Sequence, residues 1–209
     1  MSRKGRLYHL RRLIFWASPA VAEALGIDFR IHAPHRTFLE KQVFGLINTR
    51  LHGQPNARCL SIGIHKYTWH YPRLLDCELH TIDYDAGRAR YGQPGLHTTG
   101  SALELDRHYP SATFPVVLVN GVVGFGIDSE DGFNQLMAQV ATVCTDDALV
   151  VLGYNNRPDR LSFDLERAAG LALFEPVLPP IAGLTGPAHE VDDGHRHRYL
   201  FLRKAAVAG

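Results

Sequence analysis

The 209-residue sequence has no CxxC pair and only three cysteines, Cys59, Cys77 and Cys144. A sparse, odd number of cysteines argues against a disulfide scaffold and favours a reducing compartment. An excess of charge of one sign is missing too, because 22 basic side chains balance 21 acidic ones to a net charge of +1. We therefore expect no nucleic-acid partner, since the chain generates no long-range attraction for a phosphate backbone.

Long hydrophobic runs are also lacking. Near the N-terminus, residues 13–17 follow Arg11 and Arg12 in the manner of a weak secretion signal, but Ser18 and Pro19 interrupt the run. It is far shorter than the ~18–20 residues that a membrane span requires. We interpret it as a helix of a soluble protein, and we expect a cytoplasmic protein without a membrane partner.

With 45% hydrophobic residues, the chain has enough material for one domain with a buried core. Residues 1–57 are predicted to be helical, with a break at Pro19 and a second helix over 36–51 that Gly53 ends. We expect them to form an N-terminal helical cap. Residues 58–209 are expected to form the main domain.

From Arg58 onward, short hydrophobic runs alternate with helical stretches. The runs predict strands at 59–62, 79–82, 96–99, 116–119, 148–152, 173–177 and 197–203, and helices are predicted over 130–144 and 159–169. Nearly continuous hydrophobic runs are typical of parallel strands buried on both faces, and their alternation with helices indicates a doubly wound α/β fold. The last strand has no helix before it, so an antiparallel return is expected.

Two residues are spaced as in nucleotide-binding folds. Gly63 follows the first strand and Asp83, 20 residues later, ends the second. In such folds the first strand–helix turn lets the backbone approach the ligand, and an acidic residue about 20 positions on accepts hydrogen bonds from the ribose. Tyr84 is then expected along an adenine, and Asp85 is expected to cap the next helix.

The turn after Gly63 argues against a dinucleotide. His65 stands where the second glycine of a dinucleotide fingerprint belongs, and the turn continues with bulky residues as far as Trp69. Close approach of a pyrophosphate requires those glycines. The pattern favours a ligand with ribose and adenine but no pyrophosphate, and we expect no NAD binding.

In this order and spacing, four segments resemble the class I S-adenosylmethionine-dependent methyltransferases: Leu60-Ser61-Ile62-Gly63, residues 80–85, Gly100-Ser101-Ala102, and residues 116–121. The resemblance covers roughly residues 58–204. It implies a Rossmann-like fold with a mostly parallel seven-stranded sheet, an antiparallel seventh strand, and S-adenosyl-L-methionine as cosubstrate. Of the family's Gly-x-Gly-x-Gly pattern, only the first glycine is kept.

The resemblance assigns cosubstrate-binding roles to Ser61, Gly63, His65, Asp83, Tyr84, Gly100, Ser101 and Asn120. Gly63 would let the methionine part approach, Asp83 would hold the ribose, and Asn120 would lie near the sulfonium. Ser101 stands where the family often has an adenine-contacting Asp. Two alternatives stay open: Gly63, Asp83 and Ser101 are ordinary turn and cap residues, and the aromatic cluster His65, Tyr67, Trp69 and His70 packs the core instead of facing a sulfonium.

On the substrate side, the resemblance points to Tyr154, His189 and His195, because the loop before the last strand would lie at the cosubstrate face. His195-x-His197 would share one face of that strand. Its spacing matches no metal-ligand signature, so no metal is expected. No base signature is visible, and the catalytic residues stay unassigned.

The first functional hypothesis is methyl transfer to a small molecule. The cap, with Phe15, Trp16, Phe29, Phe38 and Phe44, is expected to close over the ends of the fourth and fifth strands near Asn120 and Tyr154, which favours a small, partly apolar acceptor. One alternative is attack on another carbon next to sulfur, with release of methylthioadenosine. Another is a non-catalytic binding protein on a degenerate fold. The oligomeric state is open, with a homodimer as one alternative.

Overall fold

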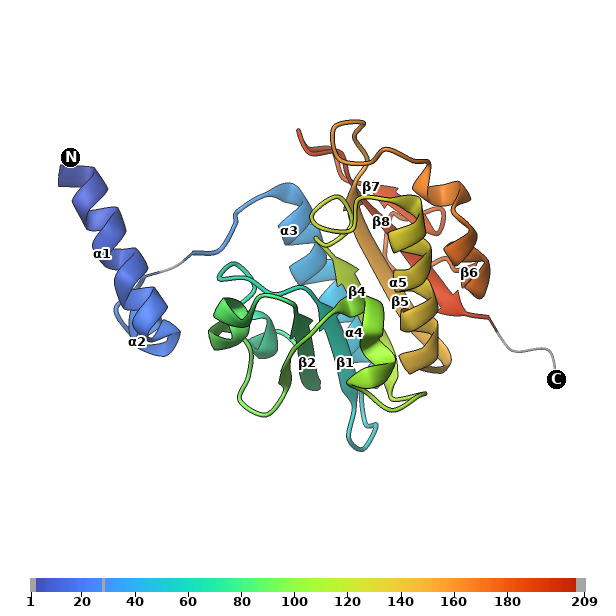
Figure 1. Cartoon of the computed structure of the whole chain (residues 1–209), viewed down its shortest axis with the longest axis horizontal. Coiled ribbons are helices and arrows are strands. Elements are labelled where there is room, and N and C mark those ends of the chain that lie inside the picture. The colour runs from blue at the N-terminus through green and yellow to red at the C-terminus, as the bar shows by residue number, and fades with distance from the viewer. Residues whose placement is uncertain (1–2, 28, 206–209) are drawn as a thin grey trace.

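The computed structural model describes residues 3–27 and 29–205 as an α/β molecule built on one mostly parallel sheet (Figure 1). The strand order is β3-β2-β1-β4-β5-β8-β6, with β7 paired to β8 off this path. The bounds are β1 Arg58–Ile62, β2 Glu78–Asp83, β3 His97–Thr99, β4 Phe114–Asn120, β5 Cys144–Asn155, β6 Phe174–Pro176, β7 Ala188–Glu190 and β8 His197–Lys204. The expected doubly wound topology is confirmed.

The antiparallel return at the end of the chain is also confirmed, because β8 runs antiparallel to β5. The sheet nevertheless has one strand more than the seven expected. β7 lies in the stretch that was expected to be a loop, and it forms a hairpin with residues 198–200 of β8. The same edge of β8 pairs with β6 at residues 202–204, so two short strands share one edge.

The helices confirm most of the predicted segments. Their bounds are α1 Arg3–Ala17, α2 Pro19–Ala24, α3 Pro34–Phe38, a π-helical stretch Leu39–Val43, α4 Phe44–Leu51 and α5 Glu130–Val143. At the predicted break, Ser18 caps α2 by accepting a hydrogen bond from the N–H of Val21 at 3.3 Å. α3, the π-helical stretch and α4 follow one another without a break, where one helix was expected.

The helix predicted over 159–169 is wrong. That region consists of turns and two short 3₁₀ helices, Leu165–Arg167 and Ala169–Leu173. Gly170 donates its N–H to Asn134 Oδ1 at 2.7 Å, and a Cβ at Gly170 would meet Asn134 Cα at 2.9 Å. Packing against α5 therefore overrides local helix propensity. The connections after β1, β2 and β3 likewise carry only 3₁₀ turns, at Tyr71–Arg73, Ala86–Tyr91 and Ala102–Arg107.

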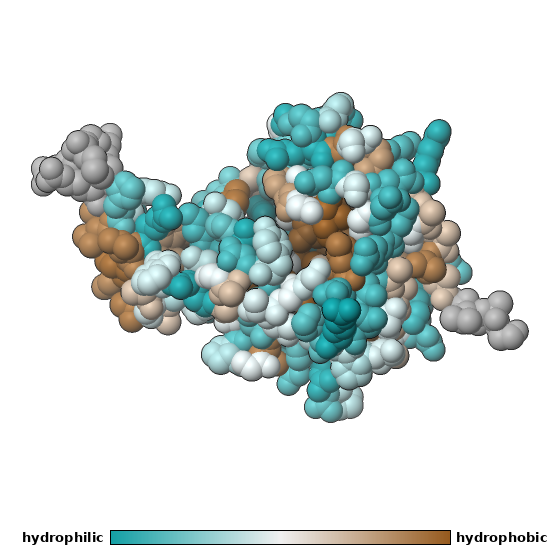
Figure 2. All heavy atoms as spheres, in the orientation of Figure 1, coloured by the Kyte–Doolittle hydropathy of each residue, from teal (hydrophilic) through white to brown (hydrophobic). Residues whose placement is uncertain are grey.

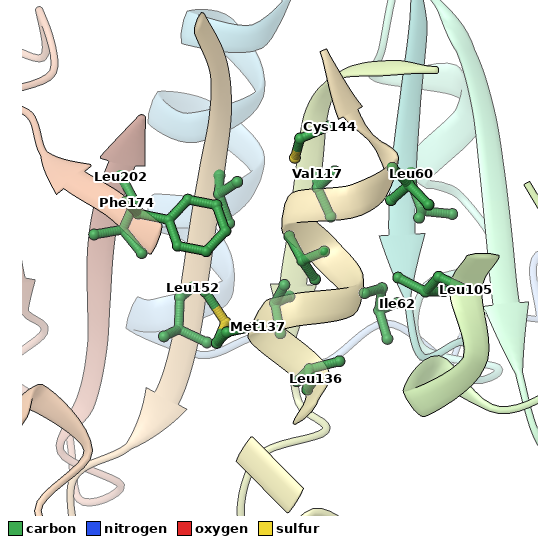
Figure 3. Close-up of a cluster of buried hydrophobic side chains, with 14 of the residues drawn as sticks. Leu60, Ile62, Leu105, Val117, Leu136, Met137, Cys144, Leu152, Phe174 and Leu202 are labelled. Carbon is green, nitrogen blue, oxygen red and sulfur yellow. The ribbon is translucent and has the colours of Figure 1, made fainter. Parts of the chain in front are cut away.

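Both faces of the sheet are buried, which explains its nearly continuous hydrophobic strands. In β4, Val117 and Val119 pack under α5, while Val116 and Leu118 face α4. Figure 3 shows the first of these cores, where α5 packs over side chains of the sheet, and labels these residues: Leu60, Ile62, Leu105, Val117, Leu136, Met137, Cys144, Leu152, Phe174 and Leu202. These two layers fix the strand ends, where the site lies.

The helices α1 and α2 lie apart from the positions expected for the cap. Phe15, Ala22 and Ile27 form a small separate cluster against Trp69 and Tyr91. This cluster is next to the 3₁₀ helix that follows β2, and α1 projects sideways from there (Figure 1). The helices therefore do not close over the ends of β4 and β5. α4 instead covers one face of the sheet. Of the described residues before β1, those that reach the cavity at the strand ends are Ile31, His35, Arg36 and Leu39.

Figure 2 shows a hydrophobic patch over α1, whose exposed side chains include Leu7, Leu10 and Leu13. In the described part of the chain, no helix is both long and hydrophobic enough to cross a membrane.

Candidate functional site

A cavity of about 630 Å³ lies at the carboxyl ends of β1, β2 and β4. The ends of parallel strands meet at one edge of a sheet, and ligands of open α/β sheets bind there. Cavities that hold small molecules measure roughly 300–1,000 Å³. In Figure 2, hydrophobic residues are visible between hydrophilic ones near the middle of the molecule, where β4 ends in Figure 1.

Most of the residues singled out from the sequence line this cavity: Ser61, Gly63, His65, Asp83, Tyr84, Gly100, Ser101, Asn120 and His195. Tyr154 does not. It is buried on the α5 side of β5, where its hydroxyl donates to Glu166 Oε1 at 2.9 Å. Successive residues of a strand point to opposite faces, so Asn155 takes the position expected for Tyr154. His189 does not line the cavity either, because its ring packs 4.4 Å from that of Phe38.

Gly63 is required by the geometry of the turn. Its φ of +84° lies in the left-handed region, and a Cβ there would meet Val122 Cγ1 at 2.7 Å. The N–H groups of the first three residues of this turn are used within the protein. Gly63 donates to the Ile82 carbonyl, Ile64 to Asp83 Oδ2, and His65 to Thr68 Oγ1, at 2.9 Å, 3.0 Å and 3.1 Å.

Asp83 ends β2 with a carboxylate that is 5% exposed and held from several sides. Oδ2 accepts hydrogen bonds from the N–H of Ile64 and from Arg88 Nη1 at 3.1 Å, while Oδ1 accepts one from the N–H of Asp85 at 2.9 Å. An ionised carboxylate has about four acceptor positions, so Oδ1 has room for another donor. Tyr84 stands at the rim of the cavity with 71% of its surface exposed.

Two of the residues singled out from the sequence, Asp85 and Ser101, are N-caps of short helices. Asp85 accepts from the N–H of Gly87 at 2.9 Å and caps the next helix, as expected; that helix is the 3₁₀ helix Ala86–Tyr91. Ser101 accepts from the N–H of Leu103 at 3.1 Å, as in the alternative cap interpretation, and also lines the cavity. A Cβ at Gly100 would meet Nε2 of the exposed His108 side chain at 2.2 Å, so a larger residue there would displace that ring.

Of the aromatic cluster His65, Tyr67, Trp69 and His70, two residues line the cavity and two pack elsewhere. His65 and Tyr67 stack with centroids 4.3 Å apart and line the cavity, whereas Trp69 packs in the α1–α2 cluster. His65 Nδ1 is buried and has no hydrogen-bond partner in the described part of the chain. Burial, followed by the charge of Arg88, lowers the pKa of His65. His70 faces away and bonds to Glu40 Oε1 at 2.8 Å.

A hydrogen-bonded chain joins the ends of three neighbouring strands. His197, the first residue of β8, contacts Asn120 Oδ1 through Nε2 at 3.1 Å and Asn155 Oδ1 through Nδ1 at 2.8 Å. Burial lowers the pKa of His197 to about 3, so the ring is neutral near pH 7. A neutral imidazole donates through only one nitrogen, so one of the two amides must present its NH₂ group.

The sequence reasoning left His197 and Asn155 out of the site. The signal was available, because Asn155 ends β5 as Asn120 ends β4. In the sheet, Asn155 pairs with His197 across adjacent strands, and Asn120 reaches His197 across Gly153 of β5. His195 lies in the turn before β8 and not on the strand, so it does not share a strand face with His197.

A histidine–carboxylate pair lies beside this chain. His35 Nδ1 and Asp193 Oδ2 are 2.5 Å apart, and the His35 ring stacks on His197 at 4.9 Å. His35 lines the cavity, and its Nε2 has no hydrogen-bond partner among the described residues. The pKa of His35 is lowered, because the effect of burial is larger than the opposing effect of its hydrogen bond to Asp193. No motif in the sequence pointed to this pair, because its members are separated by 158 positions.

Arg36 also lines the cavity, and its Nη1 donates to the Tyr71 hydroxyl at 2.7 Å. Within the described ranges, no group of three or more His, Cys, Asp or Glu side chains is placed to hold a metal ion.

No family model matches the chain, and no curated protein matches it either. Solved structures do match. The TehB-like SAM-dependent methyltransferase from Corynebacterium glutamicum is 15% identical, with a TM-score of 0.56 over 78% of this chain and 86% of that one. The N-methyltransferase NodS from Bradyrhizobium japonicum, in complex with S-adenosyl-L-homocysteine, is 12% identical, with a TM-score of 0.55 over 80% and 91%.

A third match is the [4+2]-cyclase SpnF, which is 12% identical with a TM-score of 0.59 over 95% of this chain and 96% of that one. At such identities the likeness is one of fold. The chain has the Rossmann-like fold of the class I S-adenosylmethionine-dependent methyltransferases, as the sequence resemblance predicted.

Proposed function

We propose that the protein is an S-adenosylmethionine-dependent transferase that methylates a small molecule. The observation that carries the proposal is the fixed, 5% exposed carboxylate of Asp83, which lines a ligand-sized cavity and is hydrogen-bonded to the turn that contains Gly63. The methyltransferases that share the fold, one of them in complex with S-adenosyl-L-homocysteine, support the same class of ligand.

The residues present fit such a ligand. Asp83 Oδ1 has acceptor capacity for a ribose hydroxyl, and Tyr84 at the rim offers a ring face to an adenine. His65 and Tyr67 offer aromatic faces, which favour a cation such as a sulfonium. When bound, the cosubstrate supplies an already activated methyl group, so the protein's main task is to align the acceptor and exclude water.

On the acceptor side, His35 is suited to take up a proton. It is neutral near pH 7 because burial lowers its pKa, and Asp193 orients it through Nδ1 so that Nε2 remains free as a base. Asp193 stays ionised, because hydrogen bonds from His35 and from the backbone of His195 outweigh the opposing effect of burial and lower its pKa. The pair then stabilises the imidazolium that proton uptake creates.

The acceptor in this proposal is a small molecule and not a nucleic acid. The cavity volume is about 630 Å³, and on this proposal the adenosyl ligand and the acceptor must both fit within it. A net charge of +1 gives no general attraction for a phosphate backbone.

The product distinguishes this proposal from its alternatives. The protein is incubated with S-adenosylmethionine and a small-molecule extract, and the released nucleoside is identified by mass spectrometry. S-adenosylhomocysteine together with a methylated small molecule supports the proposal. Methylthioadenosine indicates transfer of another carbon next to sulfur, and binding without any released product indicates a binding protein. The presence of a cyclase among the matching structures makes these alternatives worth measuring.

A further inference from the structure

Arg36, in α3, has hydrogen-bonding capacity that the protein does not use. Its Nη1 bonds to the Tyr71 hydroxyl, but its Nε is buried without a hydrogen-bond partner in the described part of the chain. Over the same residues it forms no ion pair. A guanidinium remains charged and carries five N–H donors in a planar fork, so Arg36 retains donors for an anionic ligand.

The other guanidinium groups of the cavity already have partners. Arg88 bonds to Asp83 at 3.1 Å and to Asp85 at 3.3 Å. Arg160 lies 3.9 Å from Asp159 and has its Cζ atom 4.8 Å from the centre of the Phe125 ring. Among the described residues that line the cavity, Arg36 is therefore the arginine without a carboxylate partner.

The first three residues of the turn after β1 offer no backbone substitute for Arg36. The N–H groups of Gly63, Ile64 and His65 all donate within the protein. Asp83 is the one acidic residue among the described residues that line the cavity, and it is itself an acceptor. A ligand carboxylate beside these three residues therefore takes its donors from other residues of the lining, and Arg36 is the guanidinium that has them to give.

We propose that Arg36 binds the carboxylate of the methionine part of the cosubstrate; this inference rests on the proposed function. The contact with Tyr71 holds Arg36 against the connection that leads from β1 to β2, next to the turn at which the methionine part is expected. The carboxylate is the only anionic group of S-adenosylmethionine. Arg–carboxylate pairs are frequently bidentate, and here the pair replaces the backbone donors that the turn has already used.

The proposal is tested with two ligands that differ only in this group: S-adenosylhomocysteine and its decarboxylated analogue, S-adenosyl-3-thiopropylamine. Calorimetry measures both affinities for the full chain, for Arg36→Gln and for Arg36→Lys. Loss of a charge-assisted hydrogen bond predicts that Arg36→Gln weakens S-adenosylhomocysteine binding about tenfold or more and changes analogue binding less than about twofold. Arg36→Lys should give an intermediate loss, because lysine keeps the charge but not the fork.

Arg167→Gln is the matched control, because Arg167 has an 87% exposed side chain and does not line the cavity. It should change neither affinity. The inference is overturned if Arg36→Gln weakens the binding of both ligands equally, since that indicates a structural role. It is also overturned if Arg36→Gln weakens the binding of neither, since the anionic group bound by Arg36 would then belong to the acceptor. If the unaltered protein binds neither ligand, the proposed function itself fails and the inference with it.

Discussion

The polar side chains around the cavity are held in place by hydrogen bonds to other parts of the chain. Asp83 is fixed by backbone N–H groups of Ile64 and Asp85, and His35 by Asp193. Asn120 is fixed through His197, and it has room because the adjacent residue on β5 is Gly153, where a Cβ would meet Asn120 Oδ1 at 2.2 Å. Groups oriented in advance cost little reorganisation when a ligand binds.

The neutral His197 predicts a pH dependence of stability. A histidine whose folded pKa is lowered to about 3 binds its proton mainly in the unfolded chain, so its contribution to stability is complete above pH 6.5 and is lost as the pH falls toward 3. Between about pH 7.5 and pH 5 this group alone should lower the free energy of unfolding by about 2 kcal/mol. Urea unfolding of the full chain and of His197→Gln at both values measures the difference.

The variant should lose correspondingly less stability over that interval, whatever its stability at pH 7.5. His52→Gln serves as the control, because His52 is an exposed residue, and it should keep the full pH dependence. Equal pH dependence in the full chain and in His197→Gln contradicts a buried, neutral His197.

The residues that were predictable from the sequence are those with a fixed relation to a strand end. Gly63, Asp83 and Asn120 each end or follow a strand, so topology brings them to one edge. Tyr154 was predicted in place of Asn155, which lies one position later. Successive side chains of a strand point to opposite faces of the sheet, so Tyr154 points away from the cavity. His35 and Arg36 could not be predicted from the sequence, because the tertiary placement of α3, and not a local motif, brings them to the cavity.

Among the elements, the turn after β1 offers a test of its own glycine. Gly63 and Gly183 have similar positive φ values, +84° and +86°, but only Gly63 is crowded, by Val122. Gly183→Ala should cost about 1 kcal/mol of unfolding free energy from the backbone conformation alone. Gly63→Ala should cost at least about 1 kcal/mol more, because Val122 must also shift, and it should weaken S-adenosylhomocysteine binding. Urea unfolding and calorimetry measure the two effects, and equal stability losses would refute the close approach at this turn.

Strands were predicted better than the connections between them. Hydrophobic runs buried on both faces mark β1, β2, β4 and β5 clearly. The connections after β1, β2 and β3 fold as 3₁₀ turns, and the region over 159–169 is shaped by its packing on α5, with Gly170 bonded to Asn134. β7 has only three residues, and its pairing with β8 is a tertiary contact that local sequence does not specify.

At the scale of the whole molecule, α1 and α2 are predicted to be dispensable for ligand binding. The cavity-lining residues begin at Ile31. The hydrophobic contacts of α1 and α2 with the rest of the chain are to Trp69 and Tyr91, beside polar contacts of Glu23 with Arg73 and of Trp16 with Arg90. Deleting residues 1–30 should leave S-adenosylhomocysteine affinity within about threefold by calorimetry. It should lower the free energy of unfolding by about 1–3 kcal/mol, because Trp69 and Tyr91 lose their apolar cover.

Phe15→Ala in the full chain is the control, since Phe15 is 3% exposed within the same cluster. It should lower stability without changing affinity. A truncated protein that is folded but has lost S-adenosylhomocysteine binding contradicts the placement of these helices outside the site.

The central claim is that this fold binds an adenosyl ligand with its ribose on Asp83. Calorimetric titration of the full chain and of Asp83→Asn with S-adenosylhomocysteine tests it most directly, with Asp146→Asn as the control because that side chain is 95% exposed. The account predicts saturable one-to-one binding that Asp83→Asn weakens by about 1.5–3 kcal/mol, the range for hydrogen bonds to a charged group, and that Asp146→Asn leaves unchanged. The absence of binding to the full chain, or equal affinity in a folded Asp83→Asn protein, would contradict it.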